Sequence, residues 1–306
     1  MNRGAEVTVK RDYLVFVRGG KTSLHHDWLK GPGPRNWDLQ VSQWLDDPEI
    51  GADGDLPISI DKGTKWDSIY RYLSANPDLM DRYRYIAFMD DDVIFTKQDL
   101  NRYFEICEEH GLLLAQPSLH ADSFFCYPIL LQCAGMKLRF SNFVECMATA
   151  IRTDYLKSFM PRMAQVKSGW GMDRIWTVTM PDPAFKSAII DEISMVHTRP
   201  HATGGIYKDF AREAVGPHAE MEALIKSYDN VPDKMMVYGG IDRRGRRLSA
   251  ARTRIANGIS LIANCWRYRD TPPCFRSGLG MFVRAVTEAN YTPQAARPLQ
   301  RKEASL

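Results

Sequence analysis

Three consecutive carboxylates interrupt an otherwise apolar stretch of the chain. Asp90, Asp91 and Asp92 follow the apolar run 85–89, and apolar residues resume at Val93. If 85–89 is a β-strand, its side chains alternate between two faces, so Asp90 and Asp92 leave its end on the same side. Carboxylate oxygens are the ligands that Mg²⁺ and Mn²⁺ prefer. The spacing therefore predicts a divalent-cation site, with a turn whose aspartates cap the next helix as the simpler alternative.

His197 is the candidate for a third ligand. It ends the short apolar segment 194–197, and a neutral imidazole nitrogen at the end of a strand can complete a metal shell begun by carboxylates. His201 competes for this role. Without the acids a structural histidine would be the better interpretation; with them, we favour ligation by His197.

A tryptophan between two glycines precedes another acid, in the order Gly169, Trp170, Gly171, Met172, Asp173. Glycines allow a backbone to approach a ligand closely, and an aspartate at a helix N-terminus could take a proton from an attacking hydroxyl. An ordinary first-turn aspartate and a core tryptophan are the alternative. The combination predicts a sugar site, with Trp170 and Gly171 in contact with substrate and Asp173 as the base.

Five further residues are weaker candidates for binding substrate. The turn at Arg18 and Gly19 offers amides and cations as a phosphate cradle, although it is not a P-loop and a solvated turn fits nearly as well. Lys65 and Asp38 are similarly placed. Glu145 is a charge within an apolar, strand-like run, where a buried acid usually has a partner or a function; an exposed strand face is the alternative.

Strands and helices alternate along the first two thirds of the chain. Apolar runs and caps predict strands at 13–17, 37–44, 85–89, 112–116, 142–151, 188–191 and 194–197, helices at 64–73, 96–110, 153–160, 218–228, 248–267 and 278–290, and a basic hairpin at 238–247. This order is typical of an α/β protein. We expect a catalytic domain over residues 8–215 and an accessory helical region over 216–306, with a disordered tail from Pro293.

Composition narrows the class of protein. The chain has 306 residues, 44% of them hydrophobic, and its 40 basic and 37 acidic residues leave a net charge of +3, too balanced to indicate nucleic-acid binding. Six cysteines without a CxxC pair indicate neither a zinc site nor a disulfide framework.

Residues 1–11 are polar, and no apolar run approaches the roughly 20 residues that span a bilayer. We expect a cytoplasmic protein; the basic stretch 243–254 leaves open a peripheral position on the inner face of a membrane.

The ordered set of motifs resembles nucleotide-sugar glycosyltransferases of the GT-A type, and more closely the family called domain of unknown function 707. The segments that carry the resemblance are 13–20, 36–44, 62–65, 90–92, 142–145, 170–173 and 196–197. They lie in consistent order within residues 12–210, and nothing beyond about residue 215 matches firmly.

The resemblance implies a GT-A-like, Rossmann-type mixed sheet flanked by helices, with a helical C-terminal extension. It implies that Asp90 and Asp92 form a DXD motif holding Mn²⁺ or Mg²⁺ on the donor diphosphate, with His197 as the late ligand. It places Asp173 where many inverting members keep the base, although retention stays open. We expect the side chain of Asp91 to point away from the metal, toward the sugar or the start of the next helix.

The expected activity is therefore metal-dependent transfer of a sugar from a nucleotide-diphosphate donor to a hydroxyl acceptor, carbohydrate or lipid-linked, in polysaccharide or glycoconjugate synthesis. Two alternatives remain. Phosphohydrolases of the haloacid dehalogenase type also place DxD after a strand, but usually after the first strand of the chain. Here the strand before the acids begins only at residue 85, and Ile94 stands where those enzymes usually have Thr or Val. A non-enzymatic carbohydrate-binding protein of the same fold is the other, and loss of Asp90 or Asp92 would have favoured it.

Overall fold

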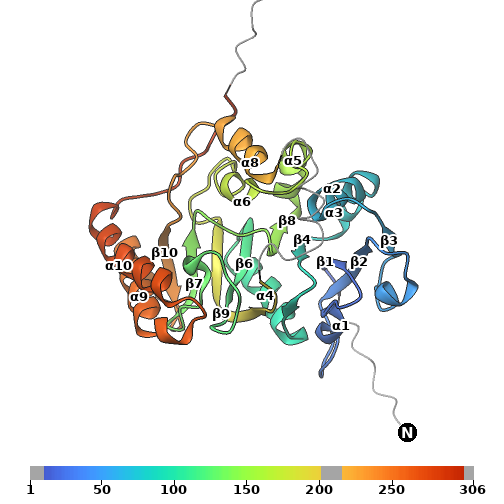
Figure 1. Cartoon of the computed structure of the whole chain (residues 1–306), viewed down its shortest axis with the longest axis horizontal. Coiled ribbons are helices and arrows are strands. Elements are labelled where there is room, and N and C mark those ends of the chain that lie inside the picture. The colour runs from blue at the N-terminus through green and yellow to red at the C-terminus, as the bar shows by residue number, and fades with distance from the viewer. Residues whose placement is uncertain (1–9, 201–215, 300–306) are drawn as a thin grey trace, which may run out of the picture.

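The structure is a computed structural model that describes residues 10–200 and 216–299, and its centre is one mixed β-sheet of eleven strands (Figure 1). The strands lie in the order β11 (Arg247–Leu248), β10 (Val237–Asp242), β7 (Met136–Ser141), β9 (Ser187–His197), β6 (Leu114–Leu119), β8 (Ala148–Arg152), β4 (Tyr85–Met89), β1 (Tyr13–Gly19), β2 (Trp37–Gln43) and β3 (Ser59–Ile60), and β5 (Val93–Ile94) pairs with β9 off this path. β1 is parallel to both β2 and β4, whereas β8 is antiparallel to β4 and β6. The predicted mixed sheet is confirmed.

Helices cover both faces of this sheet, as the alternating pattern predicts. Buried side chains on one face pack against α4 (Lys97–Glu109), α9 (Ala250–Ala263) and α10 (Thr271–Thr287). Those on the other pack against α2 (Lys65–Ala75), α3 (Leu79–Arg82), α5 (Thr153–Met163), α6 (Met172–Ile175) and α8 (Pro217–Lys226). The short elements α1 (His25–Trp28), η1 (Pro48–Gly51), η2 (Pro128–Leu130) and η3 (Cys265–Arg267) lie in the connections. The α/β class is confirmed.

The helix that follows the acids begins at the predicted cap. Thr96 Oγ1 accepts a hydrogen bond from Asp99 N at 3.0 Å, which makes Thr96 the N-cap, and it donates one to Asp99 Oδ2 at 2.7 Å. α4 then ends at Glu109, with Gly111 at φ +58° beyond it. Because Asp99 serves this cap, the three acids before it are not needed for it.

Several element boundaries differ from the prediction. The strand expected at 142–151 begins only at Ala148, because residues 142–147 form a loop closed by bonds such as Thr149 Oγ1 to Glu145 O at 2.6 Å. β7 was not predicted. β9 is one continuous strand through Asp191, whose charge Arg139 neutralises at 2.7 Å. α5 continues through Pro161 to Met163, since one missing amide does not end a well-packed helix.

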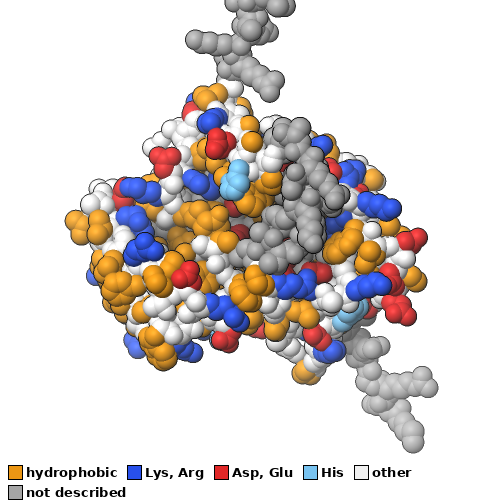
Figure 2. All heavy atoms as spheres, viewed as in Figure 1, with side chains coloured by type: hydrophobic (Ala, Val, Ile, Leu, Met, Phe, Trp, Pro, Cys, Tyr) orange, Lys and Arg blue, Asp and Glu red, His pale blue; other side chains and the backbone are white. Residues whose placement is uncertain are grey.

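The region after residue 215 is not purely helical. β10 and β11 form the predicted hairpin, and β10 pairs with β7, so this region extends the same sheet. The expected helices at 248–267 and 278–290 are α9 and α10, with ends at different residues, and orange side chains gather over them in Figure 2. The domain boundary near 215 stays a prediction.

The tail is ordered where the structure describes it, so the disorder expected from Pro293 is wrong as far as residue 299. Ala296 N donates to Val178 O at 2.7 Å, and Pro298 forms a β-bridge with Tyr228. Ala296 is also buried, with 7% of its surface exposed. Long-range packing decided this order, which local composition cannot register.

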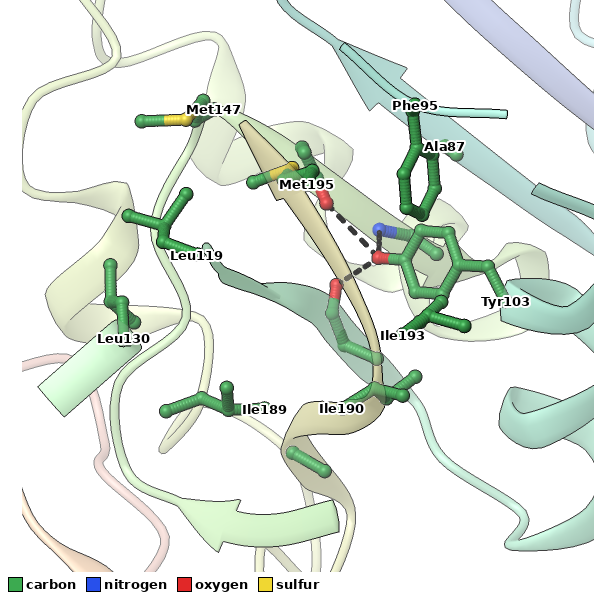
Figure 3. Close-up of a cluster of buried hydrophobic side chains, with 14 of the residues drawn as sticks. Ala87, Phe95, Tyr103, Leu119, Leu130, Met147, Ile189, Ile190, Ile193 and Met195 are labelled. Atoms are coloured by element: carbon green, nitrogen blue, oxygen red, sulfur yellow. Dashed lines mark hydrogen bonds between the residues drawn. The ribbon is translucent and has the colours of Figure 1, made fainter. Parts of the chain in front are cut away.

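Tyr103 of α4 fastens the central strands together (Figure 3). Its hydroxyl oxygen lies 2.6 Å from Ala115 O and 3.0 Å from Ala148 O and accepts a bond from Ala150 N at 2.8 Å. Burial raises the pKa of Tyr103 well above its usual value. This contact joins β6 to β8, and β8 in turn pairs with β4, the strand that carries the acids.

Candidate functional site

The acids lie at the carboxyl end of β4, beside the carboxyl end of the parallel strand β1. This is the edge of an α/β sheet where ligands bind. Directly after the acids, β5 pairs with the end of β9, with Val93 opposite His197. As a result Asp92 Oδ2 is 3.3 Å from His197 Nε2. The structure therefore brings together two residues that the sequence predicted as ligands of one ion.

The ring of His197 is oriented by its other nitrogen. Nδ1 lies 3.0 Å from Phe124 O, and since a carbonyl only accepts, Nδ1 carries a proton and Nε2 is turned to Asp92. Burial alone would raise the pKa of Asp92, but His197 and Arg199 outweigh it and the pKa is lowered. Burial likewise lowers the pKa of His197, but Asp92 outweighs it and the pKa is raised. Each group thus stabilises the charged form of the other, the carboxylate of Asp92 and the imidazolium of His197.

Asp90 is brought to the same edge but bonds a cation of the protein. Its Oδ1 is 2.6 Å from Nζ of Lys65, the first residue of α2, and Lys65 also donates to Cys146 O at 2.9 Å. Asp90, Asp92 and His197 do not have their ligand atoms all within 4.8 Å of one another. Lys65, predicted to bind substrate, therefore lies at the site, in contact with a predicted metal ligand.

Asp91 is anchored within the protein. Its Oδ2 accepts from Gly20 N at 2.9 Å, and its Oδ1 is 3.1 Å from Arg199 Nη1. Burial raises the pKa of Asp91. Asp91 thus joins the turn after β1 to the segment after β9, and its predicted contact with substrate stays a prediction. Arg199 is a site residue that sequence reasoning missed; its place two residues after His197 was the available signal.

Glu145 lies in the loop between β7 and β8 and not within a strand. Only 9% of it is exposed, and its Oε2 has no hydrogen-bond partner in the described part of the chain. Burial, with the charge of Asp173 added, raises the pKa of Glu145 to about 8. The prediction of a buried acid with a task is consistent with this environment, whereas an exposed strand face is wrong.

Asp173 stands in the first turn of α6, held under the same loop. Trp176 Nε1 donates to Val144 O at 2.9 Å, and Thr177 Oγ1 donates to Asn142 O at 2.7 Å. Asp173 as a residue is half-buried, but its Oδ1 is enclosed and has no hydrogen-bond partner among the described residues. Burial raises the pKa of Asp173 to about 6.

The glycines around Trp170 have a packing role. Gly171 has φ +91° and Gly169 φ +82°, which favour glycine, and a Cβ on Gly169 would lie 2.0 Å from Trp66 Cδ1. The ring of Trp170 is half-exposed and meets His218 edge-on, with centroids 4.8 Å apart. Tight packing thus accounts for the glycines, and contact of Trp170 and Gly171 with a sugar stays a prediction.

Arg18 and Asp38 are engaged elsewhere. The guanidinium of Arg18 donates to Ser68 Oγ at 2.7 Å and Asp61 O at 2.6 Å, so it fastens β1 to α2 and the loop before it. Gly19 ends β1, and the amide that reaches the acids belongs to the next residue, Gly20.

Asp38 is near the beginning of β2, opposite Leu14, and bonds Tyr83 Oη at 2.6 Å. This is the amino end of the strands, away from the acids, so the structure does not bring Asp38 to the site.

One other group of potential ligands was not anticipated. Among residues 10–200 and 216–299, His25, His26 and Asp53 have ligand atoms within 4.8 Å of one another. Asp53 Oδ1 is 3.2 Å from His25 Nε2, and Asp53 Oδ2 is 2.7 Å from His26 Nδ1. These bonds join the segment after β1 to the loop after β2, next to the turn that reaches Asp91.

The donor types at the sheet edge suit a divalent cation, although the ligand atoms of Asp90, Asp92 and His197 are not gathered around one point in this structure. Asp90 and Asp92 offer the carboxylate oxygens that Mn²⁺ and Mg²⁺ prefer, and His197 turns Nε2 to Asp92, but Asp90 would have to exchange Lys65 for the ion. Lys65 and Arg199 are cations at the same edge and suit a phosphate-bearing ligand.

Comparison with solved structures finds S. aureus TarS, residues 1–349. In complex with UDP-GlcNAc it is 13% identical, with a TM-score of 0.47, over 90% of this chain and 81% of that chain. With UDP the identity is 13% and the TM-score 0.43, and without either ligand they are 12% and 0.42, over the same shares. A search of the curated proteins gave no match.

A family model also matches part of the chain. It is described as "Protein of unknown function (DUF707)" and covers residues 36–140, which include Lys65 and the three acids. Over β2 to β7, the chain thus matches the DUF707 family, as its motifs indicate.

Proposed function

We propose that this protein transfers a sugar from a nucleotide-diphosphate donor to a hydroxyl group of a carbohydrate or lipid-linked acceptor, as a step in polysaccharide or glycoconjugate synthesis. The observation that carries the proposal is the contact of Asp92 with His197, which β5 creates at the carboxyl edge of the sheet. Beside it lie the buried Glu145 and the half-buried Asp173, each with one carboxyl oxygen that no described residue bonds, and the charge of Asp173 adds to the raised pKa of Glu145. Acids in two different states next to a cation site suit group transfer.

Asp90, Asp92 and His197 would hold Mn²⁺ or Mg²⁺. When bound, such an ion neutralises the charge that develops on a departing nucleoside diphosphate. Lys65 is bonded to Asp90 in this structure. If Asp90 binds the ion instead, Lys65 would be free to contact the phosphates of the donor. Arg199, held by Asp91, supplies a second cation at the same edge.

Glu145 and Asp173 suit different tasks. With a pKa of about 6, Asp173 is ionised near neutral pH and can accept the proton of an attacking hydroxyl. With a pKa of about 8, Glu145 keeps its proton and can donate a hydrogen bond to a sugar hydroxyl. A base that takes the proton of the acceptor is what an inverting transfer requires.

The test is a thermal-shift and hydrolysis panel of nucleoside diphosphates and nucleotide sugars, with Mn²⁺ and with EDTA. We expect one nucleoside diphosphate to raise the Tm of the wild type only with metal, and Asp92→Ala to lose that rise. Asp81→Ala is the matched control, because Asp81 lies on α3 with 75% of its side chain exposed. The transferase proposal fails if no nucleoside diphosphate stabilises the wild type in the presence of Mn²⁺.

The same panel separates the alternatives. A phosphohydrolase would release phosphate from an aryl phosphate and form an acid-labile aspartyl phosphate. A carbohydrate-binding protein would be stabilised by a free sugar and would hydrolyse neither the nucleotide sugar nor the aryl phosphate.

A further inference from the structure

Positive charge is concentrated in one segment near the C-terminus. Residues 243–284 contain ten arginines, no lysine and a single acid, Asp270, a net charge of +9 in a chain whose total is only +3. Eight of these arginines are exposed: Arg243, Arg244, Arg246, Arg247, Arg252, Arg267, Arg269 and Arg276. The rest of the protein is therefore net acidic.

The same segment and the end of α10 expose large apolar side chains. They are Ile255, Ile259, Trp266, Phe275, Leu279, Val283 and Val286. The fraction exposed reaches 74% for Trp266 and 81% for Val286. On α10, positions 275, 279, 283 and 286 repeat at helical spacing and share one face. In Figure 2 these helices lie at the lower left, where orange and blue side chains adjoin.

Charge and apolar surface share the outer faces of the two helices. Arg252 precedes Ile255 by three residues and Ile259 by seven, which places them on one face of α9. Arg276 has the same relation to Leu279 and Val283 on α10. We call this surface of exposed arginine and apolar side chains the α9–α10 face.

The α9–α10 face is held rigidly by the core behind it. Leu261 of α9 and Met281 of α10 are 1% exposed and belong to the core of the sheet. The two helices touch through glycines, since a Cβ on Gly258 would lie 2.9 Å from Gly278 O. The apolar residues outside are therefore on the solvent side of well-packed helices and are not displaced core residues.

We infer that the α9–α10 face docks on an anionic lipid surface. Arginines attract acidic headgroups, a tryptophan suits the headgroup boundary, and the aliphatic side chains enter the acyl region. A second copy of this chain would present the same excess of positive charge and would be repelled. The inference does not depend on the proposed sugar transfer, although a lipid-linked acceptor would be consistent with both.

Sedimentation of the full chain with vesicles tests the inference. We expect strong binding to phosphatidylcholine vesicles containing phosphatidylserine, weak binding to phosphatidylcholine alone, and a decrease in binding as salt rises. Arg252→Glu combined with Arg276→Glu should lower the partition coefficient at least tenfold, and Trp266→Ala should lower it severalfold. Lys30→Glu combined with Lys226→Glu is the matched control and should bind as the wild type does, because both side chains are 75% exposed, Lys30 just after α1 and Lys226 at the end of α8.

Three results would overturn the inference. One is no binding to acidic vesicles, and another is equal loss of binding in the control pair. The third is self-association of the wild type, measured by light scattering, together with no binding to vesicles. If Val283→Asp abolishes that self-association, a second copy of the chain covers the α9–α10 face. Circular dichroism of each variant establishes that it is folded.

Discussion

Glu145 and Asp173 are two carboxyl groups whose surroundings hold them in different protonation states at neutral pH. Burial raises both pKa values, to about 8 for Glu145 and about 6 for Asp173. Each has an oxygen without a hydrogen-bond partner in the described residues. An enclosed carboxyl oxygen without a hydrogen bond costs stability, and acids with strongly shifted pKa values are concentrated at functional sites.

The first prediction concerns stability at alkaline pH. Unfolded, Glu145 ionises near 4.5, whereas the folded protein keeps it protonated up to about 8. The stability linked to this raised pKa is present below 4.5 and is lost as the pH rises through 8. Glu145→Gln has nothing to ionise, so between pH 5 and pH 9 its free energy of unfolding should gain about 1–3 kcal/mol relative to wild type.

Urea unfolding at both pH values measures this difference. Glu222→Gln is the control, because the Glu222 side chain is 64% exposed on α8. Its free energy of unfolding should differ little from that of the wild type, and by the same amount, at pH 5 and at pH 9. A difference between Glu145→Gln and wild type that is the same at pH 5 and pH 9 would contradict a raised pKa.

The second prediction concerns the proposed base. If Asp173 takes the proton of the acceptor, kcat/KM should rise as the pH increases through about 6, because the carboxylate is the active form. Asp173→Asn should lower kcat about 10²–10⁴-fold and remove this rise, with nucleotide binding kept. Asp182→Asn, at an exposed position, should behave as wild type. A pH profile unchanged in Asp173→Asn would exclude Asp173 as the base.

At the scale of elements, short connections position the site. β5 has two residues, yet its pairing with β9 sets Asp92 against His197. The loop after β7 and the turn of α6 are joined by Trp176 and Thr177, which sets Glu145 beside Asp173. The segment before α6 packs so tightly on α2 that only glycine fits at residue 169.

The third prediction tests this packing. Gly169→Ala would place Cβ against the ring of Trp66 in addition to straining a φ of +82°, and should lower the free energy of unfolding by about 2–4 kcal/mol. Gly33→Ala is the matched control, since its φ is +79° but no atom lies within 4 Å of its Cβ, and it should lose only about 1 kcal/mol. Equal losses in chemical unfolding would show that backbone strain alone, without the collision, is responsible.

At the scale of the whole molecule, a buried ion pair joins the C-terminal helices to the sheet. Arg139 on β7 and Asp191 on β9 are fully buried and 2.7 Å apart, and Arg139 also donates to Asn257 Oδ1 of α9 at 2.8 Å. This contact and the pairing of β10 with β7 join the described region after residue 215 to the sheet that carries the site.

The fourth prediction follows from that burial. Arg139→Met would leave Asp191 charged and without its ion-pair partner, and should lower the free energy of unfolding by about 3–5 kcal/mol. Arg246→Met breaks a pair of the same 2.7 Å length, with Asp242, but Arg246 is 67% exposed and the loss should be below about 1 kcal/mol. Guanidinium unfolding of both variants measures the two values, and similar losses would contradict the role given to burial.

Features that depend on neighbouring residues could be predicted from the amino-acid sequence. Apolar runs predict β1 and β4, the Thr96 cap predicts the start of α4, and the local motifs single out Asp92, His197, Glu145 and Asp173. Such signals are local, because periodicity, caps and charge within a few residues decide them.

Which of these residues meet depends on the tertiary fold. It put Asp38 at the amino end of the strands, engaged Arg18 with α2, and paired Lys65 with Asp90. It also added β10 to the sheet and ordered the tail. These outcomes rest on contacts between residues far apart in sequence, whose free energy comes from burial and pairing that no local pattern records.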